Sequence, residues 1–364
     1  MKITRIRASE LDNSLAQRWR AWSDADPSLA SPYFCLDYLQ AVAQVRDDVF
    51  VAVLEQDGAV QGFFPYQMNS RRVAGPVGGR LSDFHGLIAS PALTGLDATA
   101  LMRALGIDIW DFDHVPASQT LFAPHAKIHD ESPIMDVSQG YAGYLEQRKA
   151  AGAQRVAQML RKARKFEREV GPLRFDADCR DRRAFDQTVQ WKREQCLRTG
   201  VPDFMSWGWT VELLERIWAV DHSGFAGRLS VLWHGDVILA AHFGMRSRSV
   251  WHWWFPGYNA TFSDHSPGGI LLLRVAEAAA QAGMSHVDLG KGQDAYKRSF
   301  ATGSIPLVEG AVMVPSLTSR LRRTRVAGRS FLRESAVLGP ARSAFRQLRN
   351  WIAPRPQAAA PHGS

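Results

Sequence analysis

Two segments of the chain share the alternation of apolar runs and turns that is typical of β-hairpins. Residues 51–68 read VAVLEQDGAVQGFFPYQM, and residues 229–246 read LSVLWHGDVILAAHFGMR. In each segment an Asp-Gly or Gly-Asp pair separates two runs rich in β-branched, aromatic and other apolar residues. Such pairs between apolar runs predict hairpins. The two segments start 178 residues apart.

A second pair of segments repeats at an offset of 177 residues. Residues 106–113 (GIDIWDFD) and 283–290 (GMSHVDLG) each follow an Ala/Leu-rich helical stretch and begin with a Gly suited to end a helix. Each then enters an apolar strand that contains an Asp, which is Asp111 in the first copy and Asp288 in the second. Two matches at nearly one offset predict two copies of one α/β unit, each with a hairpin, a third strand, a helix and a strand.

Residues 154–170 predict an amphipathic helix that connects the two copies. Apolar side chains recur there at helical spacing, six Arg and Lys side chains cover the remaining face, and Gly171-Pro172 ends the helix. The basic face either binds anions or is simply solvated, and the second interpretation is favoured because charged helix faces usually meet water. The predicted domains are an N-terminal unit at 1–147, a connection at 148–172, a C-terminal unit at 173–318 and a basic tail at 319–364.

The composition of the 364-residue chain, 46% apolar and 22% charged, is that of a globular protein of about two domains. The net charge of +8 comes from residues 319–364, which hold ten Arg and one Glu, whereas residues 1–318 hold 34 basic and 35 acidic side chains. A nucleic-acid-binding surface on the body is therefore not expected. The chain has no membrane-length apolar run, no secretory signal pattern and three widely spaced cysteines, which predicts a cytoplasmic location.

The tail has the pattern of two short basic amphipathic pieces. Between residues 319 and 352, nine Arg alternate with bulky apolar side chains, and Gly339-Pro340 divides the segment. Such pieces lie on anionic membrane surfaces, bind RNA or pack on the body of the protein. We rank peripheral contact with the inner face of a membrane first, because bulky apolar side chains gain little from contact with phosphates.

Most of the candidate functional residues lie between residues 250 and 300. An aromatic strand at 250–258 is followed by the loop NATFSDHSPGG, an apolar helix at 270–283, a strand at 285–292 and a short helix at 294–300. The sequence SPGG before the apolar helix fits a helix start, with Ser266 as N-cap and Pro267 in the first turn. The unpaired amides of a first turn suit a pyrophosphate, although many ordinary helices also begin this way.

This order of elements resembles the acyl-CoA-binding half of the GNAT N-acyltransferases. The duplicated unit, SPYF at 31–34, GPVGGRLSDFHG at 75–86 and DLGKGQDAYKRSF at 288–300 resemble the CelD-type acetyltransferase branch of cellulose biosynthesis, which is related to the FemAB peptidyltransferases. The resemblance covers about residues 1–315. It implies an α/β fold of two tandem GNAT-like units, each a twisted mixed β-sheet flanked by helices.

The resemblance also implies an activity: direct transfer of an acyl group from acetyl-CoA to an amine of a small-molecule or saccharide acceptor. The thioester would lie between the strands near 250–256 and 286–290, with a backbone amide of the first strand as oxyanion donor. Lys297 either neutralises a phosphate or substrate carboxylate or is a solvated lysine. No metal-binding, P-loop or nucleophile motif is present. The residues implied in acetyl-CoA binding are Ser266, Pro267, Gly268, Gly269, Ile270 and Lys297.

Three residues are the candidates for proton transfer. Tyr296 corresponds in place to the GNAT tyrosine that protonates the leaving thiolate, or else it packs the short helix. Asp288 is an ionisable residue in an apolar run and suits a general base, but Asp111 at the matching position favours a shared structural role. His242, together with His252 on the adjacent predicted strand, either relays a proton or belongs to the core.

Four further residues are candidates for acceptor binding. Tyr258 lies at the exit of the aromatic strand, and Trp253 lies within it, where most aromatic residues fill the core. Asp83 and His85 lie in a Gly-rich loop, where they either bind the acceptor or serve turn formation. The alternative functions are a FemAB-like aminoacyl-tRNA-dependent transferase and a non-catalytic binding module of a polysaccharide-synthesis complex.

Overall fold

The computed structural model describes residues 1–292 and 295–322, of which Met1–Val314 form one compact unit. Most of the basic tail, including its predicted membrane contact, therefore lies outside the described residues. The helices of the unit are α1 (Asn13–Ala25), α2 (Leu36–Val45), α3 (Ala98–Ala104), α4 (Gly140–Ala150), α5 (Gln154–Glu169), α6 (Arg182–Thr199), α7 (Gly208–Ala219), α8 (Pro267–Gln281) and α9 (Ala295–Phe300).

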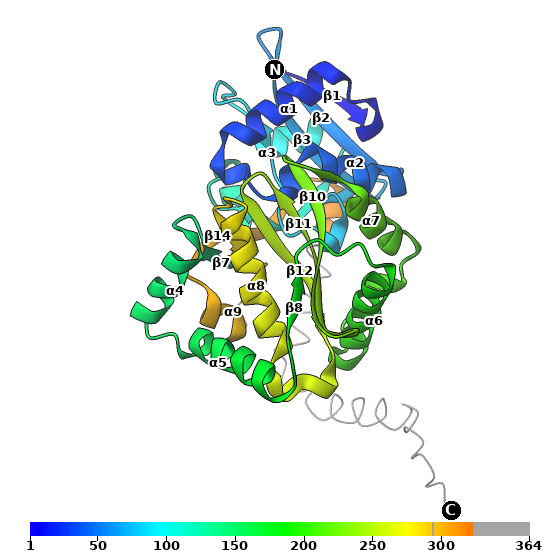
Figure 1. Ribbon diagram of the computed structural model, residues 1–364. Helices are drawn as coiled ribbons and strands as arrows, with labels where there is room; N and C mark the ends of the chain where they lie inside the picture. The colour runs from blue at the N-terminus through cyan, green and yellow to red at the C-terminus, as the bar shows by residue number, and fades with distance from the viewer. Residues whose placement is uncertain (293–294, 323–364) are drawn as a thin grey trace, which may run out of the picture. The chain divides into compact units, whose positions relative to one another are not determined.

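The strands of the described residues join one mixed sheet (Figure 1). They are β1 (Lys2–Arg7), β2 (Val49–Gln56), β3 (Ala59–Ser70), β4 (Val73–Gly75), β5 (Ile88–Ala89), β6 (Ile109–Pro116), β7 (Ala126–Asp136), β8 (Arg174–Asp176), β9 (Asp221–His222), β10 (Phe225–His234), β11 (Val237–Ser247), β12 (Val250–Tyr258), β13 (His286–Asp288) and β14 (Gly303–Met313). The order along the sheet is β1-β2-β3-β4-β6-β14-β7-β13-β12-β11-β10-β8, with β5 on β3 and β9 on β10.

The sheet contains the predicted repeat twice. Hairpins β2–β3 and β10–β11 form at the predicted positions, and each copy has one parallel pair, β4 with β6 and β12 with β13. The last strand of each copy is exchanged: β7 follows β6 in the chain but pairs with β13, and β14 follows β13 but pairs with β6. The mixed α/β fold with two repeats is thus confirmed, while the boundaries assigned to the two units stay a prediction.

The connecting helix forms as α5, and its apolar stripe packs onto the second repeat. Val156, Met159 and Phe166 are buried in a cluster with α8 and with β12. Apolar residues at this spacing share one face of a helix, so the Arg and Lys residues between them face outward. The predicted loop before α8 differs from expectation: residues Ala260–His265 form a 3₁₀ helix, because the Asn259 side chain accepts a hydrogen bond from the Thr261 amide.

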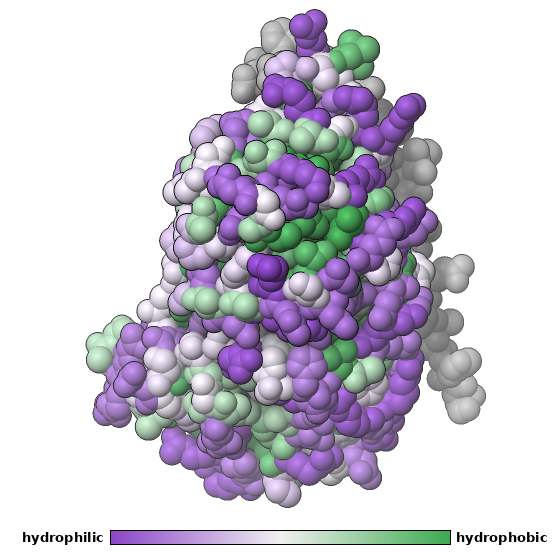
Figure 2. Space-filling model, turned by 90° about the horizontal axis from the view of Figure 1, so that it is seen from above, coloured by the Kyte–Doolittle hydropathy of each residue, from purple (hydrophilic) through white to green (hydrophobic). Residues whose placement is uncertain are grey.

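Helices cover both faces of the sheet near β12, whose side chains alternate between two apolar clusters. Trp251 and Trp253 pack with α8, whereas Trp254 and Phe255 pack with residues of α6 and α7. The intervening His252 is therefore directed away from α8, toward the side where the first repeat contributes its loops. Figure 2 shows one face of the molecule, where polar side chains surround a smaller area of hydrophobic ones.

Candidate active site

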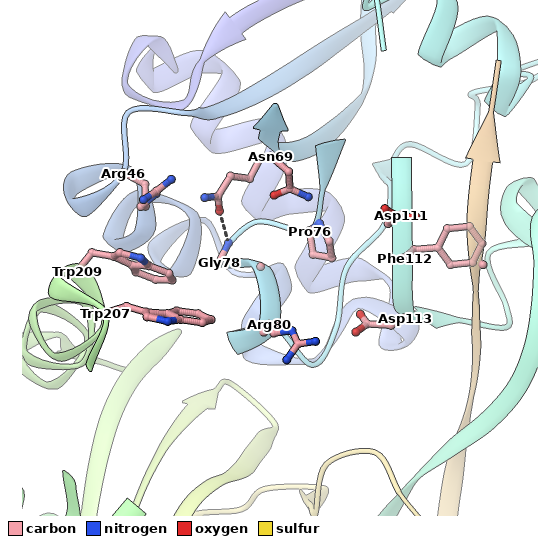
Figure 3. A pocket seen from close by; sticks show the side chains of 13 residues that line it. Arg46, Asn69, Pro76, Gly78, Arg80, Asp111, Phe112, Asp113, Trp207 and Trp209 are labelled. Atoms are coloured by element: carbon pink, nitrogen blue, oxygen red, sulfur yellow. Dashed lines mark hydrogen bonds between the residues drawn. The ribbon is translucent and has the colours of Figure 1, made fainter. Parts of the chain in front are cut away.

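A pocket of about 420 Å³ is lined by residues of both repeats. Trp207 and Trp209, at the start of α7, form one wall (Figure 3). The strand β6 forms the opposite wall with Asp111 and Asp113, and the loop around Gly78 lies between them. The side chains with charged, amide or aromatic groups in this pocket include Arg46, Asn69, Arg80, Asp111, Asp113, Trp207 and Trp209.

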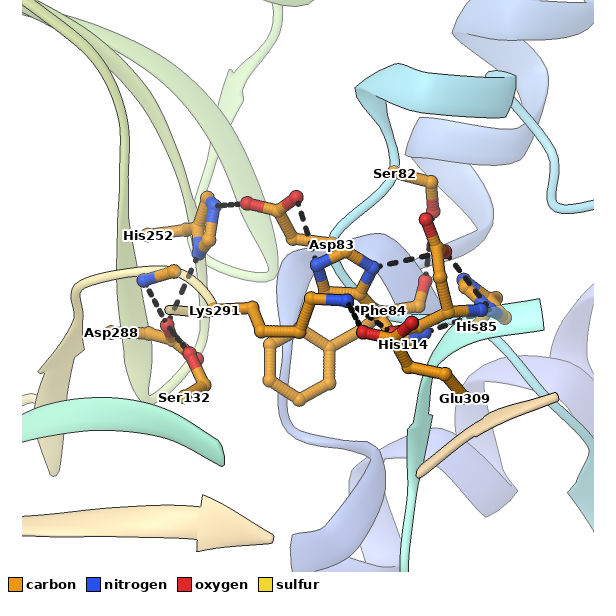
Figure 4. A network of polar contacts seen from close by, with 12 residues as sticks. Ser82, Asp83, Phe84, His85, His114, Ser132, His252, Asp288, Lys291 and Glu309 are labelled. Carbon is orange, nitrogen blue, oxygen red and sulfur yellow. Dashed lines mark hydrogen bonds and ion pairs between the residues drawn. The ribbon is translucent and has the colours of Figure 1, made fainter. Parts of the chain in front are cut away.

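Beside this pocket, His252 lies between two carboxylates (Figure 4). Its Nε2 atom is 2.9 Å from Asp83 Oδ2, and its Nδ1 atom is 3.6 Å from Asp288 Oδ1. The His252 and Asp288 side chains are buried, while the Asp83 side chain is 24% exposed. Asp83 follows the 3₁₀ turn Gly79–Leu81 of the first repeat, so the two repeats meet in this contact.

The strands explain why His252 and Asp288 lie together. They are partners in the last pair of the parallel β12–β13 register. β13 ends at Asp288 because Gly290 has a φ of 73°, which turns the chain, whereas β12 continues to Tyr258. Pairing of the two strands therefore ends at this residue pair, in the region where the resemblance to the GNAT N-acyltransferases implies the thioester.

Asp288 is held through one of its oxygens only. The Ser132 hydroxyl donates to Asp288 Oδ1 over 2.6 Å, and the Gly290 amide donates to the same atom over 2.7 Å. Asp288 Oδ2 is buried and accepts no hydrogen bond from any described residue. A buried carboxylate oxygen without a donor is costly, so this atom is suited to accept a hydrogen bond from a ligand.

The three side chains shift each other's pKa values. Burial alone would lower the pKa of His252, but its contacts with Asp288 and Asp83 raise it to about 9. Burial would raise the pKa of Asp83, but the hydrogen bond and charge of His252, with the charges of His114 and Lys297, lower it to about 2. Burial likewise opposes ionisation of Asp288, whose pKa is lowered by His252 and Ser132. At neutral pH the group therefore holds one positive and two negative charges.

His114 extends this polar group to the wall of the pocket. Its Nε2 atom lies 3.5 Å from Asp83 Oδ1, and its Nδ1 atom lies 3.0 Å from Asp113 Oδ1. Asp113 lines the pocket, so a single imidazole connects the pocket wall to Asp83. Lys291 donates to the Asp113 carbonyl over 2.8 Å and pairs with Glu309.

Two of the predicted site histidines, His85 and His242, accept hydrogen bonds from backbone amides. His85 Nε2 accepts hydrogen bonds from the Asp113 and His114 amides, and burial lowers the pKa of His85 to about 3. His242 Nε2 accepts a hydrogen bond from the Trp254 amide over 3.0 Å, and its ring stacks on Trp253 at 4.0 Å. Burial lowers the pKa of His242 well below the usual value, which keeps the ring neutral for this contact.

The start of α8 has some of the hydrogen-bond donors on which the predicted pyrophosphate site depends. The Gly269 and Ile270 amides both donate to the Ser266 carbonyl, whereas the Gly268 amide donates to none of the described residues. Ser266 is the N-cap residue, but its hydroxyl accepts from Lys162 Nζ over 2.8 Å rather than capping the helix. With Pro267 as the first residue of α8, this start offers an anion the Gly268 amide and the Lys162 ammonium group.

Gly269 serves packing instead of ligand approach. A Cβ atom at Gly269 would lie 2.6 Å from Met159 Sδ, so its missing side chain makes room for α5. A Cβ atom at Gly268 would meet only the Tyr258 ring, at an ordinary 3.7 Å. Tyr258 itself is 48% exposed at the end of β12.

The two predicted site residues on the short helix α9, Tyr296 and Lys297, differ in their exposure to solvent. The Tyr296 side chain is 40% exposed, whereas Lys297 is buried. Lys297 Nζ donates to the Gly290 carbonyl over 3.1 Å and to the Lys291 carbonyl over 2.8 Å. Lys297 thereby holds the turn that ends β13.

The structure brings Asp83, Asp288 and Lys297 together around His252, and it leaves His242, Trp253 and His85 as buried supports. Sequence reasoning missed Asp113, His114 and Ser132 in the polar group, and the tryptophans of the pocket. The dipeptide Asp113-His114 at the end of a predicted strand was the one available signal, since polar residues that follow buried strands often line sites.

Comparison with known proteins gives a family match for the region that contains most of the second repeat. Residues 153–298 match the family model described as an acetyltransferase (GNAT) domain. FemX has 11% identity and a TM-score of 0.55, covering 85% of this chain and 96% of that one. L-PGS from Bacillus licheniformis has 12% identity and a TM-score of 0.51, covering 85% and 94%. The comparison with curated proteins gives no match.

The matched domain defines the class of protein: with an acetyltransferase (GNAT) domain at residues 153–298, the chain is an enzyme of the acyltransferase type. FemX shares its fold. No helix within residues 1–292 and 295–322 is long and apolar enough to cross a membrane. Within the same residues, no group of three or more His, Cys, Asp or Glu side chains is arranged to hold a metal ion.

Proposed function

We propose that the protein transfers an acyl group from acyl-CoA, with acetyl-CoA as the expected donor, to the amine of an amino sugar or polysaccharide precursor. The observation that carries this proposal is that the β12–β13 pairing ends at the buried His252–Asp288 pair. A thioester bound beside the unpaired ends of these strands would lie near a proton-accepting group and within reach of backbone amides of β12.

Binding of the donor is supported by the start of α8. A pyrophosphate needs hydrogen-bond donors and positive charge, and the Gly268 amide and Lys162 supply one of each. The exposed ring of Tyr258, 3.7 Å from the Cβ position of Gly268, gives the neighbouring part of the cofactor a surface to pack on.

The reaction is direct aminolysis of the thioester. Asp83 attracts the acceptor's ammonium group, and His252 in its neutral form receives the first proton of that group through Asp83, which leaves a free amine. The amine nitrogen then forms a bond to the carbonyl carbon, the carbon–sulfur bond breaks, and a second proton leaves the nitrogen while one reaches the sulfur. Asp288 raises the basicity of His252, and the partly exposed Tyr296 is the proposed donor of the proton to the thiolate.

Thermal unfolding of the purified protein with acetyl-CoA, desulfo-CoA or ATP tests the donor. A ligand at about 100 times its Kd stabilises the folded state by roughly 2.7 kcal/mol, a shift of a few degrees for a chain of this size. We expect the shift with both CoA compounds and not with ATP. The Gly268→Asp variant should lose it, because a carboxylate would stand where a phosphate binds. Gly208→Asp, at the open start of α7, is the matched control.

Absence of any shift at millimolar acetyl-CoA would contradict the proposed donor. A normal shift in Gly268→Asp would contradict the proposed position of the pyrophosphate. Acyl transfer itself is then measured as release of free CoA thiol in the presence of amine acceptors, with acetylated product identified by mass spectrometry.

Aminoacyl-tRNA is the second candidate donor. The observation in its favour is the outward basic face of α5, which carries Arg155, Arg161, Arg164, Lys165 and Arg168. Binding through such a face falls steeply with salt. Acceptor modification that requires charged tRNA and is abolished by ribonuclease would support this candidate, and ribonuclease-resistant activity with acetyl-CoA would exclude it.

A further inference from the structure

Two tryptophan rings form an exposed aromatic platform in the pocket. The ring centroids of Trp207 and Trp209 lie 6.0 Å apart with 28° between the planes, and both side chains are partly exposed. The Arg46 guanidinium lies 5.5 Å from the Trp209 ring centroid and is itself held by Asp48. Aromatic rings left open to solvent within a pocket provide a large apolar contact area for a ligand.

The rest of the pocket presents polar groups toward the platform. Figure 3 shows Asp113 on the wall opposite the tryptophans and Arg80 between Trp207 and Asp113, and Asn69 also lines the pocket. Neither Asn69 nor Arg80 makes a side-chain hydrogen bond or ion pair with the described residues, so their donors are available to a ligand. An amide, a guanidinium and a carboxylate around an aromatic platform match a ring with one apolar face and several hydroxyl groups at its edge. A pyranose has this chemistry.

We propose that this pocket binds a pyranose ring of an amino-sugar oligosaccharide and directs an amine of that oligosaccharide toward Asp83. The inference rests on the proposed function and specifies its acceptor. Asp113 on the pocket wall contacts His114, which contacts Asp83, so acidic groups lead from the pocket to His252. Carboxylates at this position favour a cationic amine over a neutral amide. The pocket volume of about 420 Å³ falls within the roughly 300–1,000 Å³ of small-molecule sites.

A nucleobase is another flat ring that tryptophans stack on, and the test therefore includes a nucleotide as a competing ligand. Tryptophan fluorescence of the full chain is titrated, without acetyl-CoA, with a glucosamine trisaccharide, its fully N-acetylated form, a glucose trisaccharide and UDP. We expect a saturable change with the glucosamine trisaccharide at least tenfold tighter than with the other two saccharides. Saturation by UDP alone would overturn the inference.

Two variants locate the site. Trp209→Ala should abolish the response to the glucosamine trisaccharide, and Asp113→Asn should weaken its binding about tenfold. Trp22→Ala, whose partly buried ring lies outside the pocket and packs on Phe63, is the control and should retain the response. Undiminished binding in Trp209→Ala would overturn the position of the site. Equal affinity for the free and N-acetylated trisaccharides would overturn the selection of an amine.

The outcomes separate this inference from the function on which it rests. Thermal stabilisation by acetyl-CoA is measured for the same proteins, and we expect it to be unchanged in Trp209→Ala and Asp113→Asn. Normal stabilisation by acetyl-CoA with no response to any saccharide would overturn the acceptor site alone. Binding of the glucosamine trisaccharide without any stabilisation by acetyl-CoA would support the acceptor site and contradict the proposed donor.

Discussion

His252 and Asp83 are 169 positions apart in the chain, and their side chains meet at 2.9 Å. The contact joins the last rung of the β12–β13 pair to a loop of the first repeat. Neither repeat holds this arrangement alone, because the second supplies the imidazole and the first supplies the partly exposed carboxylate of Asp83. In the proposed mechanism the two copies therefore have different roles: the second provides the β12–β13 strand ends beside which the donor would bind, and the first brings an acidic loop to them.

Replacement of Asp83 should impair transfer without impairing donor binding. Asp83→Asn removes the negative charge that attracts the acceptor's ammonium group and lowers the basicity of His252. We expect kcat/KM for the amine to fall by about 10²–10⁴-fold, the usual contribution of general acid–base catalysis. Asp236→Asn, in the exposed turn of the β10–β11 hairpin, is the control. A variant Asp83→Asn with normal kcat/KM would remove Asp83 from the site.

The pH dependence of transfer should reflect His252. Its pKa is raised to about 9 by Asp288 and Asp83, so the neutral form that accepts a proton becomes populated only as the pH approaches 9. The logarithm of kcat/KM should therefore rise with pH and level off near 9. Deprotonation of His252 and deprotonation of the acceptor amine both predict this rise of kcat/KM with pH, and acceptors whose amines differ in pKa distinguish them. A rise whose midpoint shifts with the pKa of the acceptor would assign it to the amine and not to His252.

The same shift predicts how stability depends on pH. In the unfolded chain His252 would lose its proton near pH 6.5, but in the folded protein it keeps the proton up to about pH 9. The contribution is fully present below about pH 6.5 and is lost as the pH rises to about 9, amounting to up to about 3 kcal/mol. Denaturant unfolding between these values should show the decline, and His252→Gln should show a flatter profile. An equally steep decline in that variant would assign it to other groups.

The fold could be predicted because it depends on local patterns. The hairpin turns and the apolar stripe that includes Val156 and Phe166 each needed only short stretches of sequence, and the two offsets revealed the duplication. The exchange of β7 and β14 could not be predicted, because it is a choice between equivalent positions in two similar repeats of one sheet. Periodicity specifies which face of a strand is buried but not which strand lies beside it.

The site was only partly predictable for the same reason. The sequence identifies Asp83 and Asp288 as candidates because one is an acid in a Gly-rich loop and the other is an acid in an apolar strand. Nothing in the local sequence indicated that both carboxylates contact His252. His242 and His252 look alike in sequence, and only the tertiary contacts separate a backbone acceptor from an ionised partner of two carboxylates. Trp207 was missed because an aromatic residue before a helix usually belongs to the core.

The two glycines at the start of α8 should respond differently to alanine. In Gly269→Ala the new Cβ would lie 2.6 Å from Met159 Sδ, and overpacking of this kind costs about 1–3 kcal/mol. In Gly268→Ala the Cβ meets only Tyr258 at 3.7 Å, so stability should be unchanged or higher by roughly 0.5–1 kcal/mol. Denaturant unfolding measures both. Met159→Ala should relieve much of the cost in Gly269→Ala, and equal effects of the two single variants would contradict this packing.

Replacement of Tyr296 by phenylalanine distinguishes a role of this residue in proton donation from a role in packing. Its side chain is 40% exposed on α9, so Tyr296→Phe removes a hydroxyl without opening a cavity in the core. If the hydroxyl protonates the leaving thiolate, kcat should fall about 10²-fold while stabilisation by acetyl-CoA stays the same. Tyr141→Phe, on α4, is the control and should leave both values unchanged. A normal kcat in Tyr296→Phe would mean that the thiolate leaves unprotonated or takes its proton from water, and the proposed role of Tyr296 would be wrong.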